Sequence, residues 1–249
     1  MKIQLIGFDF GLKLNQKRKL FIEIVNGSDA DLILFPGHTL RDLADLYNIE
    51  PDLTNEKSMV VLELEDHYPT SCLHLQTALF LVREGMPEDL CTSQIFTTAS
   101  EIDGDEVLMA KLLDEIPRRQ FKCGGMRITV LQCGETALLA STKAEGYKAS
   151  FRFKDNVELN KRYEEMLAST DIFLNPIHTP QGRQWVMAQR RATLSADGRY
   201  YFMTGSLPQK SAGKLRSKSL QYVWHDGKEL TIQPVIHEKG MYVSRIIEI

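Results

Sequence analysis

The stretch RITVLQCGE, residues 127–135, joins a strand pattern to a cysteine and a turn. Its first residues are apolar and strand-forming, and they lead into Cys133 and Gly134. The residues that follow, ETALLA, predict the start of a helix. A cysteine between a strand and a helix N-terminus lies where free N–H groups favour a thiolate or an oxyanion. The stretch therefore predicts a nucleophilic thiol, with a buried structural cysteine as the alternative.

The composition is that of an ordinary soluble protein, with 43% hydrophobic and 25% charged residues in a chain of 249. We expect one α/β domain over residues 1–249. A net charge of −3 argues against a nucleic-acid partner and against a polybasic membrane surface. No run approaches the roughly 18 apolar residues that would predict a membrane span. The N-terminal apolar run is too short for a signal peptide, so we expect a cytoplasmic protein.

Four cysteines are present, namely Cys72, Cys91, Cys123 and Cys133. They are too few for a disulfide scaffold of this size. They form no CxxC pair, and no paired Cys/His spacing indicates zinc. The sequence therefore predicts reduced thiols, no metal and no cofactor.

Apolar runs and amphipathic periodicity alternate along the chain. Strands are predicted at residues 2–9, 31–35, 58–65, 77–82, 91–98, 126–132, 171–174, 200–204, 221–225, 229–234 and 242–247. Helices are predicted at 12–25, 40–47, 156–168 and 181–194, residues 105–116 fit either structure, and the basic segments 118–122 and 214–218 are expected to be solvated loops. Strands that alternate with helices and then end in hairpins predict an α/β fold with a mixed sheet.

Five motifs follow one another in a distinctive order. They are FPG at 35–37, Lys111 ahead of DEIP at 114–117, CGE at 133–135, NP at 175–176 after a short strand, and RRAT at 190–193. This series resembles the carbon–nitrogen hydrolase (nitrilase/amidase) superfamily over nearly the whole chain. The resemblance implies a four-layer α-β-β-α sandwich and a homodimer.

The resemblance also implies a chemistry. A cysteine attacks a small amide or nitrile, a lysine stabilises the developing negative charge, and water hydrolyses the acyl-thioester. Cys133 matches the nucleophile and Lys111 the lysine, and the Gly134 N–H would be a second oxyanion donor. The family's glutamate base has no match, because Gly37 stands in its place. Losing a general base typically costs about 10²–10⁴-fold in rate.

Several residues are candidates to replace that base, each with a plainer alternative. His38 is adjacent in sequence and would form a Cys–His pair, or it is an ordinary loop histidine. Glu63, Glu65 and Asp66 end a predicted strand, where carboxylates are usually exposed. Glu135 is more consistent with a structural hydrogen-bond partner near a helix start.

Two classes of function remain open on the sequence. The first is a hydrolase with an altered base, in which Gly37, Asn175 and His178 line the substrate pocket. The second is a catalytically inactive member that binds a ligand or a protein partner. If the base is merely missing, Gly37→Glu is expected to restore thioester formation.

Overall fold

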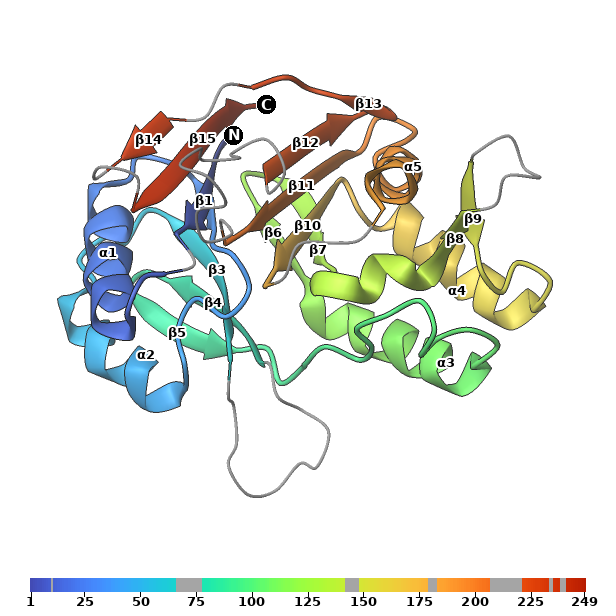
Figure 1. Ribbon diagram of the computed structural model, residues 1–249, viewed down its shortest axis with the longest axis horizontal. Helices are drawn as coiled ribbons and strands as arrows, with labels where there is room; N and C mark the ends of the chain where they lie inside the picture. Colours follow the sequence, from blue (N-terminus) through green and yellow to red (C-terminus); the bar gives the residue numbers. More distant parts are fainter. Residues whose placement is uncertain are drawn as a thin grey trace.

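The computed structural model describes residues 1–9, 11–65, 78–141, 148–178, 183–206, 221–232, 235–237 and 241–249. Two β-sheets lie face to face, with helices on their outer sides (Figure 1). The first sheet has the order β14-β15-β1-β2-β3-β4-β5. Its strands are β1 (Lys2–Phe8), β2 (Leu32–Leu34), β3 (Met59–Leu64), β4 (Ala78–Arg83), β5 (Met86–Asp89), β14 (Val235–His237) and β15 (Tyr242–Glu248).

The second sheet has the order β13-β12-β11-β10-β7-β6. Its strands are β6 (Gln120–Cys123), β7 (Met126–Val130), β10 (Ile172–Ile177), β11 (Tyr200–Gly205), β12 (Gln221–His225) and β13 (Lys228–Glu229). A separate ribbon pairs β8 (Leu139–Ser141) with β9 (Ala149–Phe151). Both large sheets are mixed as predicted, since β2 runs parallel to its neighbours β1 and β3 whereas β4 is antiparallel to β3.

The helices are α1 (Leu14–Gly27), α2 (Leu43–Ile49), α3 (Glu106–Glu115), α4 (Val157–Ala168) and α5 (Gln184–Leu194). Short 3-10 helices are η1 (Glu50–Asp52), η2 (Ile116–Arg119) and η3 (Cys133–Leu138). Figure 1 shows α1 and α2 beside the first sheet and α3, α4 and α5 on the side of the second.

Three apolar clusters hold these layers together. In β3, Val60 packs with the residues of α1 and α2, whereas Val61 packs between the sheets, because successive strand residues point to opposite faces. The cluster between the sheets joins Ile3, Leu5, Leu34 and Val61 of the first to Ile128, Val130, Ile172 and Leu174 of the second. A third cluster packs the second sheet against α3, α4 and α5. The α-β-β-α sandwich implied by the resemblance is therefore confirmed.

Several sequence predictions are wrong in detail. Residues 91–98 form irregular chain rather than a strand, and 105–116 resolves as α3. The segment 118–122 contains η2 and β6 instead of a solvated loop, and Arg119 within it is fully buried. The helix expected after Cys133 is the six-residue η3 followed by β8, which the sequence pattern did not indicate. The candidate base Asp66, the thiol of Cys72 and the loop expected at 214–218 fall outside the described residues.

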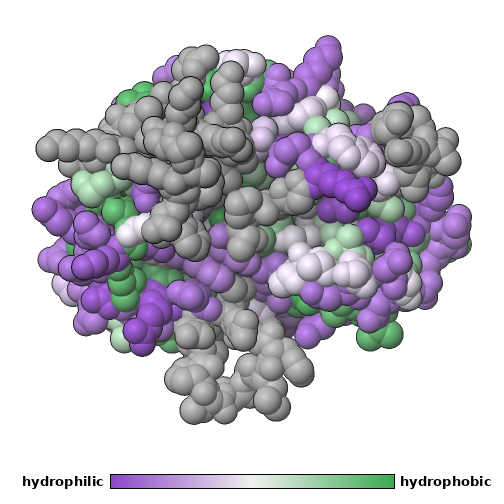
Figure 2. All heavy atoms as spheres, viewed as in Figure 1, coloured by the Kyte–Doolittle hydropathy of each residue, from purple (hydrophilic) through white to green (hydrophobic). Residues whose placement is uncertain are grey.

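Where Figure 2 colours the visible face by hydropathy, hydrophilic side chains predominate and apolar side chains lie between them. Among the described residues, no helix combines the length and the apolar character that crossing a membrane requires.

Candidate active site

Cys133 lies just past the end of β7, at a sharp change in chain direction. Its φ of 25° is close to the left-handed region, which a non-glycine residue rarely occupies. Its side chain is buried, at 4% exposure, and it is the first residue of η3. A strained backbone at the end of a strand is common at functional sites, where the surrounding contacts hold it in place.

Those contacts are visible on both sides of the turn. A Cβ built at Gly134 would lie within bonding distance of the Thr97 carbonyl oxygen, so only glycine fits there. Glu135 holds the same loop, because one carboxylate oxygen accepts the Ile95 N–H at 2.7 Å. The other oxygen accepts the Gln132 N–H at 2.7 Å and pairs with buried Arg119 at 2.5 Å.

Through these contacts Glu135 stabilises the turn at Cys133. Burial raises the pKa of its carboxyl, while Arg119 and the hydrogen bonds act in the opposite direction. Both of its oxygens are already engaged, so the carboxylate anchors the turn and offers no free acceptor to a thiol. This agrees with the structural alternative drawn from the sequence.

Asn175 supports the turn from the second sheet. Its side-chain amide donates to the backbone carbonyls of Leu131 and Cys133, at 2.5 and 3.2 Å. Its carbonyl oxygen accepts from the Tyr201 hydroxyl at 2.8 Å. Asn175 is fully buried, so the structure gives it a positioning role, whereas the sequence suggested that it lines a pocket.

The first sheet brings Gly37 and Glu63 to the same place. The pairing of β2 with β3 continues past β2, where the Thr39 N–H donates to the Glu63 carbonyl at 3.1 Å. Gly37 donates its own N–H to the Ile177 carbonyl of β10 at 3.1 Å, which joins the two sheets. A Cβ at residue 37 would stand 2.4 Å from Glu63 Oε2. The carboxylate of Glu63 thus fills the space that a side chain at position 37 would enter.

Glu63 is fully buried and bonded across the sheet interface. Its Oε1 accepts a hydrogen bond from the Gln132 side-chain amide at 2.6 Å. Its Oε2 lies 3.7 Å from Nδ1 of His178, a separation that suits an ion pair and exceeds a hydrogen bond. Gln132 directly precedes Cys133, so one residue ties this carboxylate to the turn at Cys133.

His178 follows the last residue of β10 and contacts both Cys133 and Glu63. Burial lowers the pKa of its imidazole, but the interactions with Cys133 and Glu63 outweigh burial and raise the pKa to about 10. The imidazolium form is therefore favoured at neutral pH. A cysteine beside a protonated histidine is an arrangement that activates thiols for nucleophilic attack.

His38 stacks on His178, with ring centroids 4.0 Å apart and planes 6° from parallel. Burial lowers the pKa of His38, Glu63 opposes that effect and His178 adds to it. Lys17 and Glu65 also face His38, and Lys17 donates to the His38 backbone carbonyl at 3.2 Å. A neutral imidazole stacked on a charged one is the protonation pattern that these shifts favour.

Three side chains of this cluster have donor atoms of the kind that bind metal ions. His38, Glu63 and His178 each offer one ligand atom, and these atoms lie within 4.8 Å of one another. A metal-bound imidazole directs its lone pair in the plane of the ring toward the ion. Parallel stacked rings direct their lone pairs past one another, so the observed arrangement suits an ion pair with Glu63 better than a shared metal.

Two other candidates lie away from this cluster. Lys111 projects from α3 with an exposed side chain, which does not match a lysine at the bottom of a pocket beside a buried sulfur. The order of Lys111 and Cys133 along the chain follows the motif, but the lysine side chain leaves α3 on its exposed face. Glu65, the other carboxylate candidate on this strand end, is exposed.

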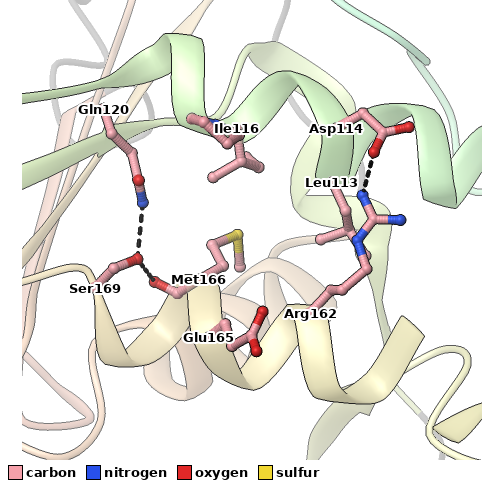
Figure 3. A pocket seen from close by; sticks show the side chains of 9 residues that line it. Leu113, Asp114, Ile116, Gln120, Arg162, Glu165, Met166 and Ser169 are labelled. Carbon is pink, nitrogen blue, oxygen red and sulfur yellow. Dashed lines mark hydrogen bonds and ion pairs between the residues drawn. The ribbon is translucent and has the colours of Figure 1, made fainter. Parts of the chain in front are cut away.

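A groove of about 430 Å³ lies between α3 with η2 and α4. Its apolar lining comes from both walls, with Leu113 and Ile116 on one and Met166 on the other, and an ion pair joins Asp114 to Arg162 across it (Figure 3). None of the candidate site residues lines it.

Comparison with solved structures gives matches over the full length of the chain. A CN-hydrolase superfamily protein from Xanthomonas campestris, with an arsenic adduct in its active site, has a TM-score of 0.54 at 13% identity; the match covers 100% of this chain and 90% of that one. An amidase from Nesterenkonia sp. has a TM-score of 0.57 at 11% identity, with 99% and 90% covered. The fold is that of the carbon–nitrogen hydrolases.

A third match widens the range of proteins that use this carbon–nitrogen hydrolase fold. A glutamine-dependent NAD(+) synthetase from Cytophaga hutchinsonii has a TM-score of 0.59 at 11% identity. The match covers 99% of this chain, which spans only 42% of the length of that protein. No family model and no curated protein matches the sequence.

Proposed function

We propose that the protein is a thiol-dependent carbon–nitrogen hydrolase that cleaves a small amide or nitrile through an acyl-thioester on Cys133. The observation that carries this proposal is the contact between the Cys133 thiol, on its strained turn, and the imidazole of His178. The fold supports it, since solved carbon–nitrogen hydrolases share it.

For an amide, the reaction has two halves. In the resting pair the imidazole of His178 holds the proton, so the Cys133 thiolate adds to the carbonyl carbon, while the Gly134 N–H faces the developing oxyanion. The C–N bond then breaks, and the imidazolium gives its proton to the departing amine. Water adds to the thioester and gives a proton to the neutral imidazole, the C–S bond breaks, and the acid leaves with the thiolate–imidazolium pair restored.

The comparisons suggest which probes to use. Variants of the Nesterenkonia amidase have been solved with butyramide, with acrylamide, and with the acetamide group of fluoroacetamide attached to the active-site cysteine. We expect this protein to release ammonia from butyramide or acrylamide and to form a covalent adduct with fluoroacetamide at Cys133. Cys133→Ala should abolish both, whereas Cys123→Ala, at a buried cysteine on β6, should abolish neither.

One observation favours a second function. Lys111 is exposed on α3, so the described residues do not put the expected lysine beside the sulfur. That departure favours a protein that has kept the fold but uses it to bind a ligand or a partner. Failure of Cys133 to react with fluoroacetamide, with no ammonia released from either amide, would support this function and exclude the hydrolase.

A further inference from the structure

The sequence of β3, MVVLEL, puts one carboxylate into an otherwise apolar strand. Glu63 is two residues from Val61, so both side chains point to the same face. Val61 packs between the two sheets, and Glu63 is likewise fully buried at the end of that layer. A carboxylate is almost never completely buried without a partner that offsets the loss of water.

The partners of Glu63 come from the second sheet. The Gln132 amide donates to Oε1, and among the described residues nothing donates a hydrogen bond to Oε2. His178 is the cation that faces this oxygen, at 3.7 Å. The buried negative charge is therefore balanced by the same imidazole that contacts the Cys133 thiol.

Gly37 supplies the room for this carboxylate. A Cβ at residue 37 would meet Glu63 Oε2 at 2.4 Å, the backbone nitrogen of His178 at 2.8 Å and the backbone carbonyl carbon of Ile177 at 2.9 Å. At distances under 3.0 Å the neighbouring atoms would have to shift, and two of these three atoms belong to the backbone. The carboxylate of Glu63 can therefore occupy this place because residue 37 has no side chain.

We infer that Glu63 is the positioning carboxylate of a Cys133–His178–Glu63 triad, carried on β3 in the space that Gly37 leaves open. Through Oε2 it orients the imidazole and favours its protonated form, and Gln132 holds Oε1 in register with the nucleophile turn. The role of the triad in turnover rests on the proposed hydrolase function, but its effect on the thiol does not. Lys17, His38 and Glu65 also face this cluster and set the background charge.

The test is the pH profile of Cys133 alkylation in Glu63→Gln, with exposed Cys91 of the same protein as the internal reference. Glutamine keeps the size of the side chain and an oxygen for Gln132, and removes only the charge. We expect the ratio of Cys133 to Cys91 labelling by iodoacetamide at pH 6 to fall about tenfold or more, the effect of one pKa unit of lost stabilisation. Peptide mapping by mass spectrometry gives both rates.

Two further variants complete the design. Glu65→Gln removes a charge from the same strand end, where the side chain is exposed, and should leave the ratio close to that of the unsubstituted protein. Glu63→Asp keeps the charge but withdraws it by one methylene, and should give an intermediate ratio. An unchanged ratio in Glu63→Gln, an equal fall in Glu65→Gln, or a Cys133 that no variant lets react would each overturn the inference.

The outcome separates this inference from the proposed function. If the protein releases no ammonia from amides but the labelling ratio still depends on Glu63, the triad stands and the hydrolase does not. If ammonia release requires Cys133 while Glu63→Gln leaves its pH profile and the labelling ratio unchanged, the hydrolase stands and the triad does not.

Discussion

Replacing Gly37 with alanine adds one methyl group to space that is already filled. The added carbon would meet the Glu63 carboxylate and two backbone atoms of residues 177 and 178, all closer than 3.0 Å. The carboxylate is held by Gln132 and the backbone atoms belong to the end of β10, so none of them is the free end of a flexible chain. We therefore expect overpacking that costs about 1–3 kcal/mol of unfolding free energy.

That cost is measurable as a melting temperature. A chain of this size loses about 2–4 °C per kcal/mol, so the midpoint of Gly37→Ala should fall by about 2–12 °C. Gly27→Ala is a matched control, because nothing lies within 4 Å of a Cβ at the end of α1. That control should be neutral or slightly stabilising. Equal midpoints for the two variants in scanning calorimetry would refute the steric argument.

The same geometry reverses an expectation drawn from the sequence. The sequence predicts that Gly37→Glu restores a missing base, but the Cβ of the new side chain would lie only 2.4 Å from Glu63 Oε2. We now expect Gly37→Glu to be less stable than Gly37→Ala and to form no more thioester than the unsubstituted protein. Adding Glu63→Ala should recover only part of the loss, since the two backbone contacts remain.

Three further predictions concern the surroundings of the thiol. Arg119→Met leaves the Glu135 carboxylate buried without its cation, and should lower the unfolding free energy in urea by about 3–5 kcal/mol; a loss near zero would contradict the pairing. Asn175→Ala should cost about 1–3 kcal/mol in the same assay and slow alkylation of Cys133, because buried carbonyls lose their donor. The pKa of His178, about 10, exceeds its ordinary value of 6.5, so its contribution to stability should be complete below about pH 6.5 and be lost as the pH rises toward about 10. In His178→Asn the urea midpoint should change less with pH between about pH 6.5 and pH 10. An unchanged pH dependence of the midpoint would exclude the raised pKa of His178.

The strand that precedes Cys133 could be predicted because local pattern determined it. The apolar runs of β1, β2 and β7 and the strand-to-turn change at Cys133 are all visible within a few neighbouring residues. Lys111 shows the limit of motif order, since spacing along the chain does not say which face of α3 a side chain leaves from. Arg119 shows another, because its burial depends on Glu135, which lies 16 residues away.

The site required information that no local pattern holds. Glu63 and Gly37 come together because β2 pairs with β3, and His178 joins them because the two sheets face each other. One signal was present in the sequence: a glutamate at the inward position of a strand whose other members are apolar. Alternation from Val61 separates Glu63 and Glu65 from Asp66 among the three carboxylates at that strand end, but it could not choose between Glu63 and Glu65 or identify a partner.

The hydrogen bond between Gly37 and Ile177 lies where the two sheets meet, and the groups of the proposed triad come from both sheets. The thiol and the imidazole belong to one sheet, and the carboxylate belongs to the other. The distances between these groups therefore depend on how one sheet packs against the other. Small shifts in the apolar layer between the sheets, at residues such as Ile3 or Ile128, would therefore change the distances within the proposed triad.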